Sequence, residues 1–197
     1  MILNRRIEEY NILLGSKSPR RHELLAGCGI DFTPVTDIDV EEIYPEGLEP
    51  EKVPEYLANL KSEGYTPRLG TKDILITADT VVICEDEILG KPIDHNDALR
   101  ILQRLSGRKH RVVTGVVLRM AEKRVAFSAR SDVWFREITP EEAEFYINRC
   151  RPYDKAGAYG IQEWIGYIAI ERIEGSFYNV MGLPTGQLYE YLKLLTD

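Results

Sequence analysis

The segment 73–84, DILITADTVVIC, is the feature that most constrains the fold. It is rich in β-branched and other apolar residues, which predicts a buried strand. One carboxylate, Asp79, interrupts this run between two apolar stretches. Because a carboxylate in such surroundings is costly unless it is paired or metal-bound, Asp79 is a candidate general base or metal ligand. The structural alternative is an aspartate that caps a bulge or a strand end.

A shorter predicted strand leads into a helix with two arginines in its first turn. Residues 12–15 are apolar or small, and Ser18 and Pro19 then give a typical helix start, with a side-chain oxygen at the N-cap and proline at the first helical position. Arg20 and Arg21 therefore lie near the positive end of the helix dipole, where each cation costs roughly 0.3–1 kcal/mol. A bound anion would remove this conflict, so the segment predicts a phosphate site. The alternative is a solvated basic face.

The composition favours one globular domain, with two lobes as an option, that does not bind nucleic acid. The chain has 197 residues, of which 44% are hydrophobic, and a formal charge of −7 at pH 7. It can bury a sizeable core, and it shows no basic stripe for nucleic acid. Its apolar stretches are shorter than the roughly 18 residues of a membrane span, its start lacks the apolar region of a signal peptide, and its three cysteines form no CxxC pair. These features predict a cytoplasmic protein without membrane contact, zinc site or disulfide framework.

The rest of the chain alternates helices and strands early and turns into a series of strands later. Helices are expected over about 53–63 with an end near Gly64, from Asp94 or Asn96 to about 105, over about 140–149 behind a capping box at 139–142, and over about 185–195. Strands are expected at 88–89 as a hairpin partner of 73–84, within 110–136 as two or three antiparallel strands, and near 164–170. This order predicts an α/β fold with a mixed sheet.

An acidic, Pro/Gly-punctuated segment at 37–51 supplies further carboxylates. Glu41 or Glu42 could join Asp79 in holding Mg²⁺, which prefers oxygen ligands and usually keeps several waters. For most of this segment the alternative is a solvated acidic loop. The three histidines show no metal-ligand spacing and are assigned no role; they are His22, His95 and His110.

Two lysines and one glycine-rich stretch complete the candidates. Lys61 falls near the end of a predicted helix, where lysines are usually structural. Lys91 lies in the turn Gly90-Lys91-Pro92, where it could act as a fixed charge for phosphate or simply face solvent. The stretch 154–162, DKAGAYGIQ, has glycines that allow close backbone approach to a ligand. Its last residue, Gln162, carries an amide that could read a base edge or position a water.

Five short motifs follow one another along the chain. They are Ser16-Lys17-Ser18-Pro19-Arg20-Arg21, Ala78-Asp79-Thr80, Gly90-Lys91-Pro92, the stretch 154–162, and Gly175-Ser176 with Gly182-Leu183-Pro184. In this order they resemble the Maf family of nucleoside triphosphate pyrophosphatases over about residues 11–195. Each motif alone is common, and the combination is highly specific. Arg20, Thr80 and Gln162 further resemble the dTTP/UTP pyrophosphatase branch, whereas the branch acting on 7-methyl-GTP is expected to carry Trp, Gln and Glu there.

This resemblance implies an enzyme that hydrolyses dTTP, UTP or modified pyrimidine nucleotides between the α and β phosphates, giving the monophosphate and pyrophosphate. It implies a single Maf/ITPase-like domain over 1–197, with an elongated mixed sheet flanked by helices and two lobes with a central cleft. It makes Asp79 the proton acceptor and Mg²⁺ or Mn²⁺ the cofactor. The other implied roles are substrate specificity for Arg20, Thr80 and Gln162, phosphate binding for Ser16, Arg21, Lys61 and Lys91, and metal binding for Glu41 or Glu42.

Two other functions are compatible with these residues. The same site could bind a triphosphate without useful hydrolysis, as a nucleotide-sensing regulatory protein of cell division, although Asp79 suits catalysis better than the binding of an anion. A phosphatase that removes the γ-phosphate would differ only in the bond attacked, so the identity of the products separates it. The oligomeric state is left open, with a homodimer as one alternative.

Overall fold

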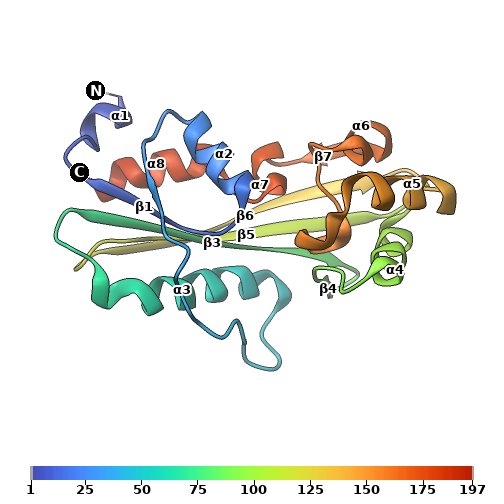
Figure 1. The fold of residues 1–197 in the computed structure, drawn as a ribbon, viewed down its shortest axis with the longest axis horizontal. Helices are drawn as coiled ribbons and strands as arrows, with labels where there is room; N and C mark the ends of the chain where they lie inside the picture. The colour runs from blue at the N-terminus through green and yellow to red at the C-terminus, as the bar shows by residue number, and fades with distance from the viewer. Residues whose placement is uncertain (1, 197) are drawn as a thin grey trace. The chain divides into compact units, whose positions relative to one another are not determined.

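The computed structural model describes residues 2–196, which form a mixed β-sheet and eight α-helices (Figure 1). The strands are β1 (Asn11–Gly15), β2 (Thr33–Pro34), β3 (Asp73–Cys84), β4 (Glu87–Leu89), β5 (Lys109–Arg119), β6 (Arg124–Phe135) and β7 (Ile170–Glu174). The helices are α1 (Leu3–Arg6), α2 (Pro19–Gly27), α3 (Val53–Tyr65), α4 (His95–Leu105), α5 (Pro140–Cys150), α6 (Trp164–Ala169), α7 (Phe177–Met181) and α8 (Thr185–Leu195).

The sheet combines parallel and antiparallel neighbours, which confirms the predicted α/β fold with a mixed sheet. The strand order is β2-β1-β3-β5-β6-β7, and β4 pairs with β3 off this path. Strand β1 runs parallel to β2 and β3, whereas β4 is antiparallel to β3 and β7 to β6. Strands β5 and β6 are neighbours joined by only a few residues, which an antiparallel pair allows and a parallel pair does not.

Several predicted elements are present because strong local signals specify them. The apolar run at 73–84 is strand β3, and its predicted hairpin partner is β4. Helix α4 begins after Asp94, whose side chain accepts a hydrogen bond from the N–H of Asp97. Helix α5 begins with the predicted capping box between Thr139 and Glu142. Caps of this kind satisfy backbone N–H groups that have no partner within the helix.

The strand predicted near 164–170 is wrong. This segment forms helix α6 and only then enters β7. Ile165 and Ala169 are buried, and a spacing of four residues places them on one helical face. At Gly166 a side chain would collide with the carbonyl group of Ile161, so a glycine is required there. A short apolar run does not by itself distinguish a buried strand from a buried helix, which explains the error.

The chain divides into two compact units, each assembled from separate segments. Unit 1 comprises the residues up to Asp79, Thr114–Ala129 and the segment from Gly182 onward, and unit 2 comprises Thr80–Val113 and Arg130–Met181. Strands β3, β5 and β6 each begin in one unit and end in the other. Two units agree with the two lobes that the resemblance implies, and the single domain expected over 1–197 stays a prediction.

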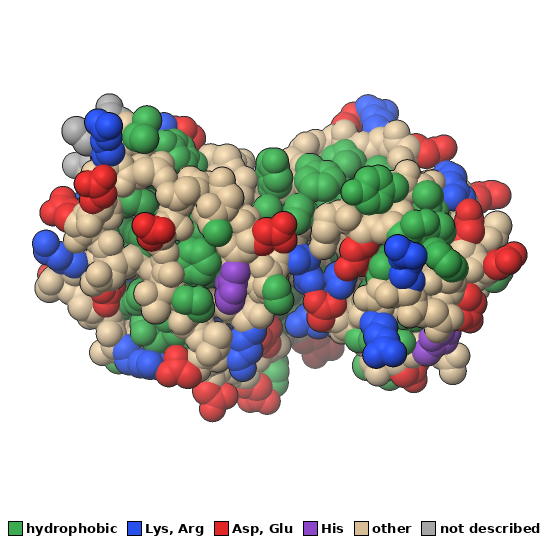
Figure 2. All heavy atoms as spheres, turned by 45° about the horizontal axis from the view of Figure 1, so that its top comes forward, with side chains coloured by type: hydrophobic (Ala, Val, Ile, Leu, Met, Phe, Trp, Pro, Cys, Tyr) green, Lys and Arg blue, Asp and Glu red, His purple; other side chains and the backbone are tan. Residues whose placement is uncertain are grey.

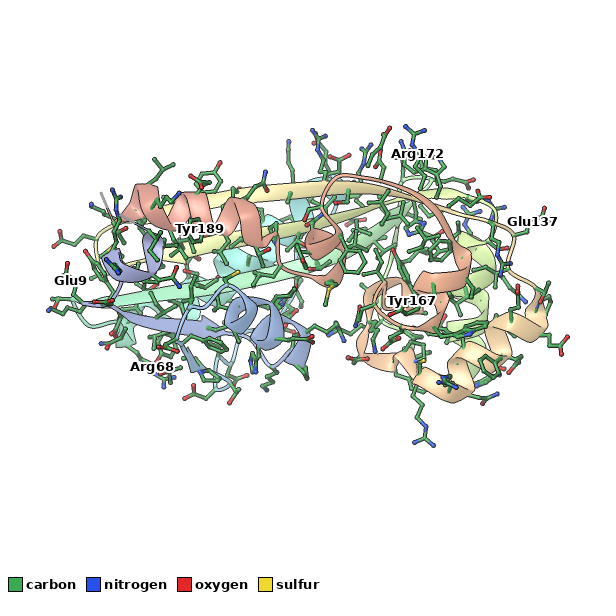
Figure 3. All side chains as sticks on the ribbon, turned by 90° about the horizontal axis from the view of Figure 1, so that it is seen from above. Glu9, Arg68, Glu137, Tyr167, Arg172 and Tyr189 are labelled. Carbon is green, nitrogen blue, oxygen red and sulfur yellow. The ribbon has the colours of Figure 1, made fainter. Side chains whose placement is uncertain are left out.

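In unit 1, helices lie on both faces of the sheet. Helices α2 and α8 cover one face, and α3 covers the other (Figure 1). Helix α1 packs against α8, where the N–H of Leu3 donates to the hydroxyl of Tyr189 at 3.0 Å (Figure 3). The end of β1 therefore leads directly into α2 on one face of the sheet, while α3 covers the other face.

The acidic segment after β2 is held against β1 and α3 by close contacts. A Cβ at Gly15 would lie 2.7 Å from Ile38 Cδ1, and one at Gly64 would lie 2.5 Å from Val40 Cγ1. Gly64 was expected to end the helix, but α3 continues to Tyr65, and this glycine serves the close approach of the acidic segment. Beyond the helix, Arg68 binds Asp37 with Nη2 2.7 Å from Oδ2 (Figure 3). These contacts fix the course of the carboxylate-rich segment over unit 1.

In unit 2, aromatic rings and one buried amide organise the interior. The rings of His110, Phe135 and Tyr159 contact one another edge to face, with centroids 4.8–5.4 Å apart. Asn179 fixes α7, because its Nδ2 donates to the carbonyl of Val112 at 3.2 Å and to the hydroxyl of Ser131 at 3.0 Å. Helix α5 packs against both α4 and α6. These contacts hold the strands and helices of unit 2 together around a packed interior.

The surface carries charges of both signs. On the face drawn in Figure 2, lysine and arginine side chains alternate with aspartate and glutamate, and no continuous basic stripe crosses that face. Tyr167 projects from α6 with 83% of its surface exposed (Figure 3). Within residues 2–196, no helix is both long and apolar enough to cross a membrane.

Candidate functional site

The loop between β1 and α2 forms a compact turn around Ser16. Ser18 is the N-cap of α2 and Pro19 is its first residue, as predicted. The expected cap from the Ser18 hydroxyl is wrong, because this side chain makes no capping hydrogen bond. Instead the Ser18 N–H donates to Ser16 Oγ at 3.2 Å, and His22 Nε2 lies 2.7 Å from the Ser16 carbonyl oxygen. His22, to which the sequence assigned no role, thus supports the predicted phosphate-binding serine.

Arg21 joins three segments of unit 1 through its guanidinium. Its Nε donates to the carbonyl of Gly182 at 2.8 Å, and its Nη1 donates to the carbonyl of Ala78 at 2.9 Å and to Ser16 Oγ at 3.4 Å. Burial lowers the pKa of Arg21, whereas the nearby Asp79 carboxylate raises it. An arginine stays protonated under such shifts, so Arg21 holds a fixed positive charge close to Asp79.

Arg20 adds a second cation beside Arg21. The charge of Arg20 is close enough to lower the pKa of Arg21, whereas the Glu42 carboxylate raises it. Two neighbouring guanidinium groups repel each other unless an anion lies between or beside them. The Asp79 and Glu42 carboxylates offset part of this repulsion at Arg21, and the phosphate site at the start of α2 stays a prediction.

Lys61 of α3 binds two carboxylates at once. Its Nζ lies 2.6 Å from Asp79 Oδ1 and 3.1 Å from Glu42 Oε2. The Lys61 and Asp79 side chains are only 14% and 15% exposed, whereas that of Glu42 is 53% exposed. The sequence left Glu41 and Glu42 as alternatives, and Glu42 is the one that reaches this cluster.

Strand β3 and helix α3 are joined next to this ion pair. The buried Thr77 hydroxyl donates to the carbonyl of Ala58 at 2.7 Å. Thr77 and Asp79 lie two residues apart, on the same face of a strand, and Ala58 and Lys61 lie three apart, on the same side of a helix. This hydrogen bond therefore sets the register that brings the Lys61 ammonium to the Asp79 carboxylate.

A divalent cation would find two of its ligands in this cluster. Glu42 and Asp79 approach a single positive charge, that of Lys61, from two sides. Among residues 2–196, no group of three or more His, Cys, Asp or Glu side chains could hold a metal ion. Mg²⁺ commonly binds one or two carboxylates together with waters and substrate phosphates, whereas structural zinc takes four protein ligands. The donor set thus fits Mg²⁺ or Mn²⁺ bound together with a phosphate.

The predicted site residues of unit 2 lie on two loops that contact each other. The N–H of Gly157 donates to the carbonyl of Gly90 at 3.1 Å, which ties the glycine-rich loop to the turn that carries Lys91. Gly157 has φ +71°, and a Cβ there would lie 2.9 Å from Val82 Cγ2. Glycine is therefore required where this loop packs on β3. Lys91 itself is exposed, and the following Pro92 is buried.

Gln162 presents a buried acceptor without a donor. Its Oε1 atom has no hydrogen-bond partner within the described residues and is shielded from solvent. A buried carbonyl oxygen of this kind costs free energy unless a ligand or a water supplies an N–H or O–H. Thr80, the other unit 2 residue expected to affect substrate choice, is half-buried in β3 directly after Asp79.

The structure thus brings together most of the predicted residues within each unit. In unit 1 the cluster consists of Ser16, Arg20, Arg21, Glu42, Lys61 and Asp79. In unit 2 the loops of Lys91 and Gln162 are tied together near β3, which carries Thr80. Such a mixture of cations and carboxylates can neutralise an anionic substrate and accept a proton.

Comparison with known proteins gives consistent matches over nearly the whole chain. The sequence profile of the family described as Maf-like protein matches residues 11–195. A dTTP/UTP pyrophosphatase of Porphyromonas gingivalis is 56% identical over 189 residues, covering 95% of this chain and 95% of that protein. Proteins of the same name from Parabacteroides distasonis and Flavobacterium johnsoniae are 46% and 39% identical, covering 95% and 98% of this chain and 97% and 100% of those proteins. Among solved structures, a HAM1 protein from Coxiella burnetii matches with 15% identity and a TM-score of 0.49, covering 94% of this chain and 99% of that chain.

Proposed function

Because this chain belongs to the Maf family, we propose that it is a nucleoside triphosphate pyrophosphatase that hydrolyses dTTP and UTP. The reaction converts the triphosphate into the monophosphate and pyrophosphate. Relatives named dTTP/UTP pyrophosphatases, which match almost end to end, support this activity.

The observation that carries the proposal is the cluster of Lys61, Asp79 and Glu42 beside Arg21. Lys61 Nζ lies 2.6 Å from Asp79 Oδ1, and the Arg21 charge is close enough to both carboxylates to respond to them. A triphosphate needs cations to neutralise its oxygens, and hydrolysis needs a base to take a proton from water. This cluster supplies both.

Asp79 is the base in this mechanism. Since Lys61 binds Oδ1, the other carboxylate oxygen is the proton acceptor for an attacking water. The water oxygen forms a bond to the α-phosphorus while the bond from that phosphorus to the α–β bridging oxygen breaks. The bridging oxygen leaves with pyrophosphate, and the proton of the water passes to Asp79.

The cations of the cluster bind and orient the phosphates. Arg20, Arg21 and Lys61 place positive charge around Asp79, and the exposed Lys91 supplies a further point charge. Ser16 contributes a hydroxyl that already accepts from the Ser18 N–H. A divalent metal, held by Glu42 together with waters and the substrate, would add charge neutralisation at the phosphate oxygens when bound.

Base choice falls to Arg20, Thr80 and Gln162. The amide oxygen of a glutamine accepts hydrogen bonds, so Gln162 can accept one from the N3–H of uracil or thymine. The bases of dTTP and UTP differ by one methyl group, which a pocket distinguishes by only about 1–3 kcal/mol. One pocket can therefore accept both nucleotides, as well as related modified pyrimidines.

A cytoplasmic location agrees with this activity, since its substrates are cellular metabolites. We also expect a small-molecule substrate and no nucleic acid or membrane partner, in agreement with the mixed charges on the face drawn in Figure 2. The homodimer stays a prediction, which sedimentation of the purified protein would test.

Hydrolysis in H₂¹⁸O tests the proposed activity directly. The protein is incubated with Mg²⁺ and each of dTTP, UTP, CTP, ATP, GTP and 7-methyl-GTP. The products are separated by anion exchange, and mass spectrometry measures the ¹⁸O content of each product. We expect monophosphate and pyrophosphate from dTTP and UTP, with one ¹⁸O atom in the monophosphate because water attacks the α-phosphorus.

Other products would contradict the proposal in distinct ways. Label in pyrophosphate would move the attack to the β-phosphorus. A diphosphate with orthophosphate would identify a γ-phosphatase. Binding of UTP without turnover would favour the nucleotide-sensing alternative.

A further inference from the structure

A ring of side-chain contacts surrounds the loop that carries Gln162. Lys155, at the start of this loop, is 7% exposed, and its Nζ lies 3.0 Å from Glu163 Oε1 and 2.8 Å from Asp154 Oδ1. The other oxygen of Glu163 accepts a hydrogen bond from the hydroxyl of Tyr146 in α5. The residue directly after Gln162 is therefore held by the start of the loop and by a neighbouring helix.

Tyr146 also forms a hydrogen bond with the middle of the loop. Its hydroxyl accepts the N–H of Gly160 at 3.0 Å, and its side chain is fully buried. Burial and the hydrogen bond to the negatively charged Glu163 both raise the pKa of Tyr146, so the hydroxyl keeps its proton and donates to that carboxylate. One buried hydroxyl thus links Gly160 to Glu163, the two residues that bracket the segment of Gln162.

Gly160 leaves the space that this ring occupies. A Cβ at this position would lie 2.9 Å from Glu163 Cδ and 3.1 Å from Lys155 Cε. The side chains of the Lys155–Glu163 ion pair thus pack directly against the backbone of Gly160. Ion pairs with so little exposure are costly to break, because the partner left behind is a buried, unpaired charge.

The orientation of Gln162 matters because its amide has two different ends. Its oxygen accepts a hydrogen bond and its NH₂ group donates, so a half-turn of the amide exchanges the two. With the oxygen forward it binds the N3–H of uracil or thymine. With the NH₂ forward it would bind N3 of cytosine, which carries no hydrogen. A site that holds the amide in one orientation can therefore distinguish these bases.

We propose that Tyr146, Lys155 and Glu163 are positioning residues that hold the loop of Gln162 in one conformation, and so set the orientation in which its amide meets the base. This inference rests on the proposed function, in which Gln162 reads the base. The three residues act through Gln162 and do not touch the reacting phosphates. Their loss therefore changes discrimination between UTP and CTP more than it changes the rate of the chemical step.

The variant Tyr146→Phe tests this with a minimal change, because it removes only the bridging hydroxyl. We expect its KM for UTP to rise about tenfold, its kcat to stay within about threefold of the wild type, and its preference for UTP over CTP in kcat/KM to fall about tenfold. The matched control is Tyr159→Phe, which removes a buried hydroxyl of the same loop that binds His110 Nε2 at 2.8 Å. This control should keep the wild-type preference.

A double variant shows whether the effect passes through Gln162. In a Gln162→Ala background, Tyr146→Phe should cause no further loss of preference, because the amide that it positions is gone. Thermal unfolding shows whether each variant is folded. If Tyr146→Phe does not fold, Glu163→Gln replaces it, and the same changes in nucleotide preference are expected. Equal preferences in Tyr146→Phe and Tyr159→Phe, or a further loss in the Gln162→Ala background, would overturn the positioning role.

The wild-type protein separates this inference from the proposed function. A wild type that hydrolyses UTP and CTP equally well would overturn base reading by Gln162, and with it the reason for positioning. A wild type that prefers UTP, with a Tyr146→Phe variant that keeps this preference, would overturn only the positioning role.

Discussion

Unit 1 and unit 2 each contain a lysine that binds two carboxylates, but the two arrangements differ in what surrounds the less exposed carboxylate. In unit 1, Lys61 binds Asp79 and Glu42, and the Glu42 side chain is 53% exposed. In unit 2, Lys155 binds Asp154, which is 56% exposed, and Glu163, which is 22% exposed and is also bound by the buried Tyr146. Each lysine thus has one exposed partner, but the shielded carboxylate of unit 1, Asp79, lies near the Arg21 guanidinium, whereas that of unit 2, Glu163, is bound by a buried hydroxyl.

This difference separates chemistry from recognition. A carboxylate that takes a proton during phosphate hydrolysis must lie beside the cations that neutralise the phosphates, so the place of Asp79 between Lys61 and Arg21 suits that task. A loop that reads a base must keep one conformation, so a closed network such as that of Glu163 suits it. Both are lysine–carboxylate pairs, and only the surroundings of each pair reveal its role.

The variant Asp79→Asn should have the largest effect, and it tests whether the unit 1 cluster carries out the chemistry. We expect kcat to fall by about 10²–10⁴-fold, because the amide cannot take the proton from water, while UTP binding measured by calorimetry stays within about threefold. The matched control is Asp154→Asn, which also removes a carboxylate from a lysine, at 2.8 Å. This control should change kcat by less than about threefold. Wild-type turnover in Asp79→Asn would remove this residue as the base.

The neighbouring glutamates provide a second, smaller contrast. Glu42→Gln should raise the Mg²⁺ concentration for half-maximal activity about tenfold, since it removes a carboxylate ligand. Glu41→Gln changes the adjacent residue in the same acidic segment and should leave that concentration within about twofold. Titration of activity with Mg²⁺ at a fixed UTP concentration measures both. Equal shifts in the two variants would show that the segment acts only through its overall charge.

Much of the fold could be predicted from the sequence where signals are local. The twelve residues of β3, the Asp94 cap and the Thr139–Glu142 capping box are each specified by residues next to one another. Helix α6 could not be recognised in this way, because it is a short apolar segment whose helical form depends on Gly166 fitting against Ile161. Contacts of that kind are visible only in three dimensions.

The candidate site divides along the same line. Asp79 stands out because a carboxylate in an apolar strand is unusual, and the resemblance supplied its expected role. Its partner could not be chosen between Glu41 and Glu42, because the course of the acidic segment depends on close contacts with Gly15 and Gly64, distant in sequence. The network of Tyr146 was missed because a tyrosine on the apolar face of a helix gives no sign that its hydroxyl binds a loop.

The buried interior of unit 2 should also make the free energy of unfolding depend on pH. This last prediction concerns stability, and we expect it to have the smallest effect on activity. Burial lowers the pKa of His110 to about 3 from its usual 6.5, so the unfolded chain binds a proton that the folded chain excludes. Stability should therefore fall as the pH drops below about 6.5, by up to about 1.4 kcal/mol per pH unit from this group. The lowered pKa values of Asp132 and Glu142, both about 2, affect stability only at lower pH. Urea unfolding between pH 7 and pH 5 measures this dependence, and His110→Gln should remove the part of the slope that His110 contributes. An unchanged slope in the variant would place the titrating group elsewhere.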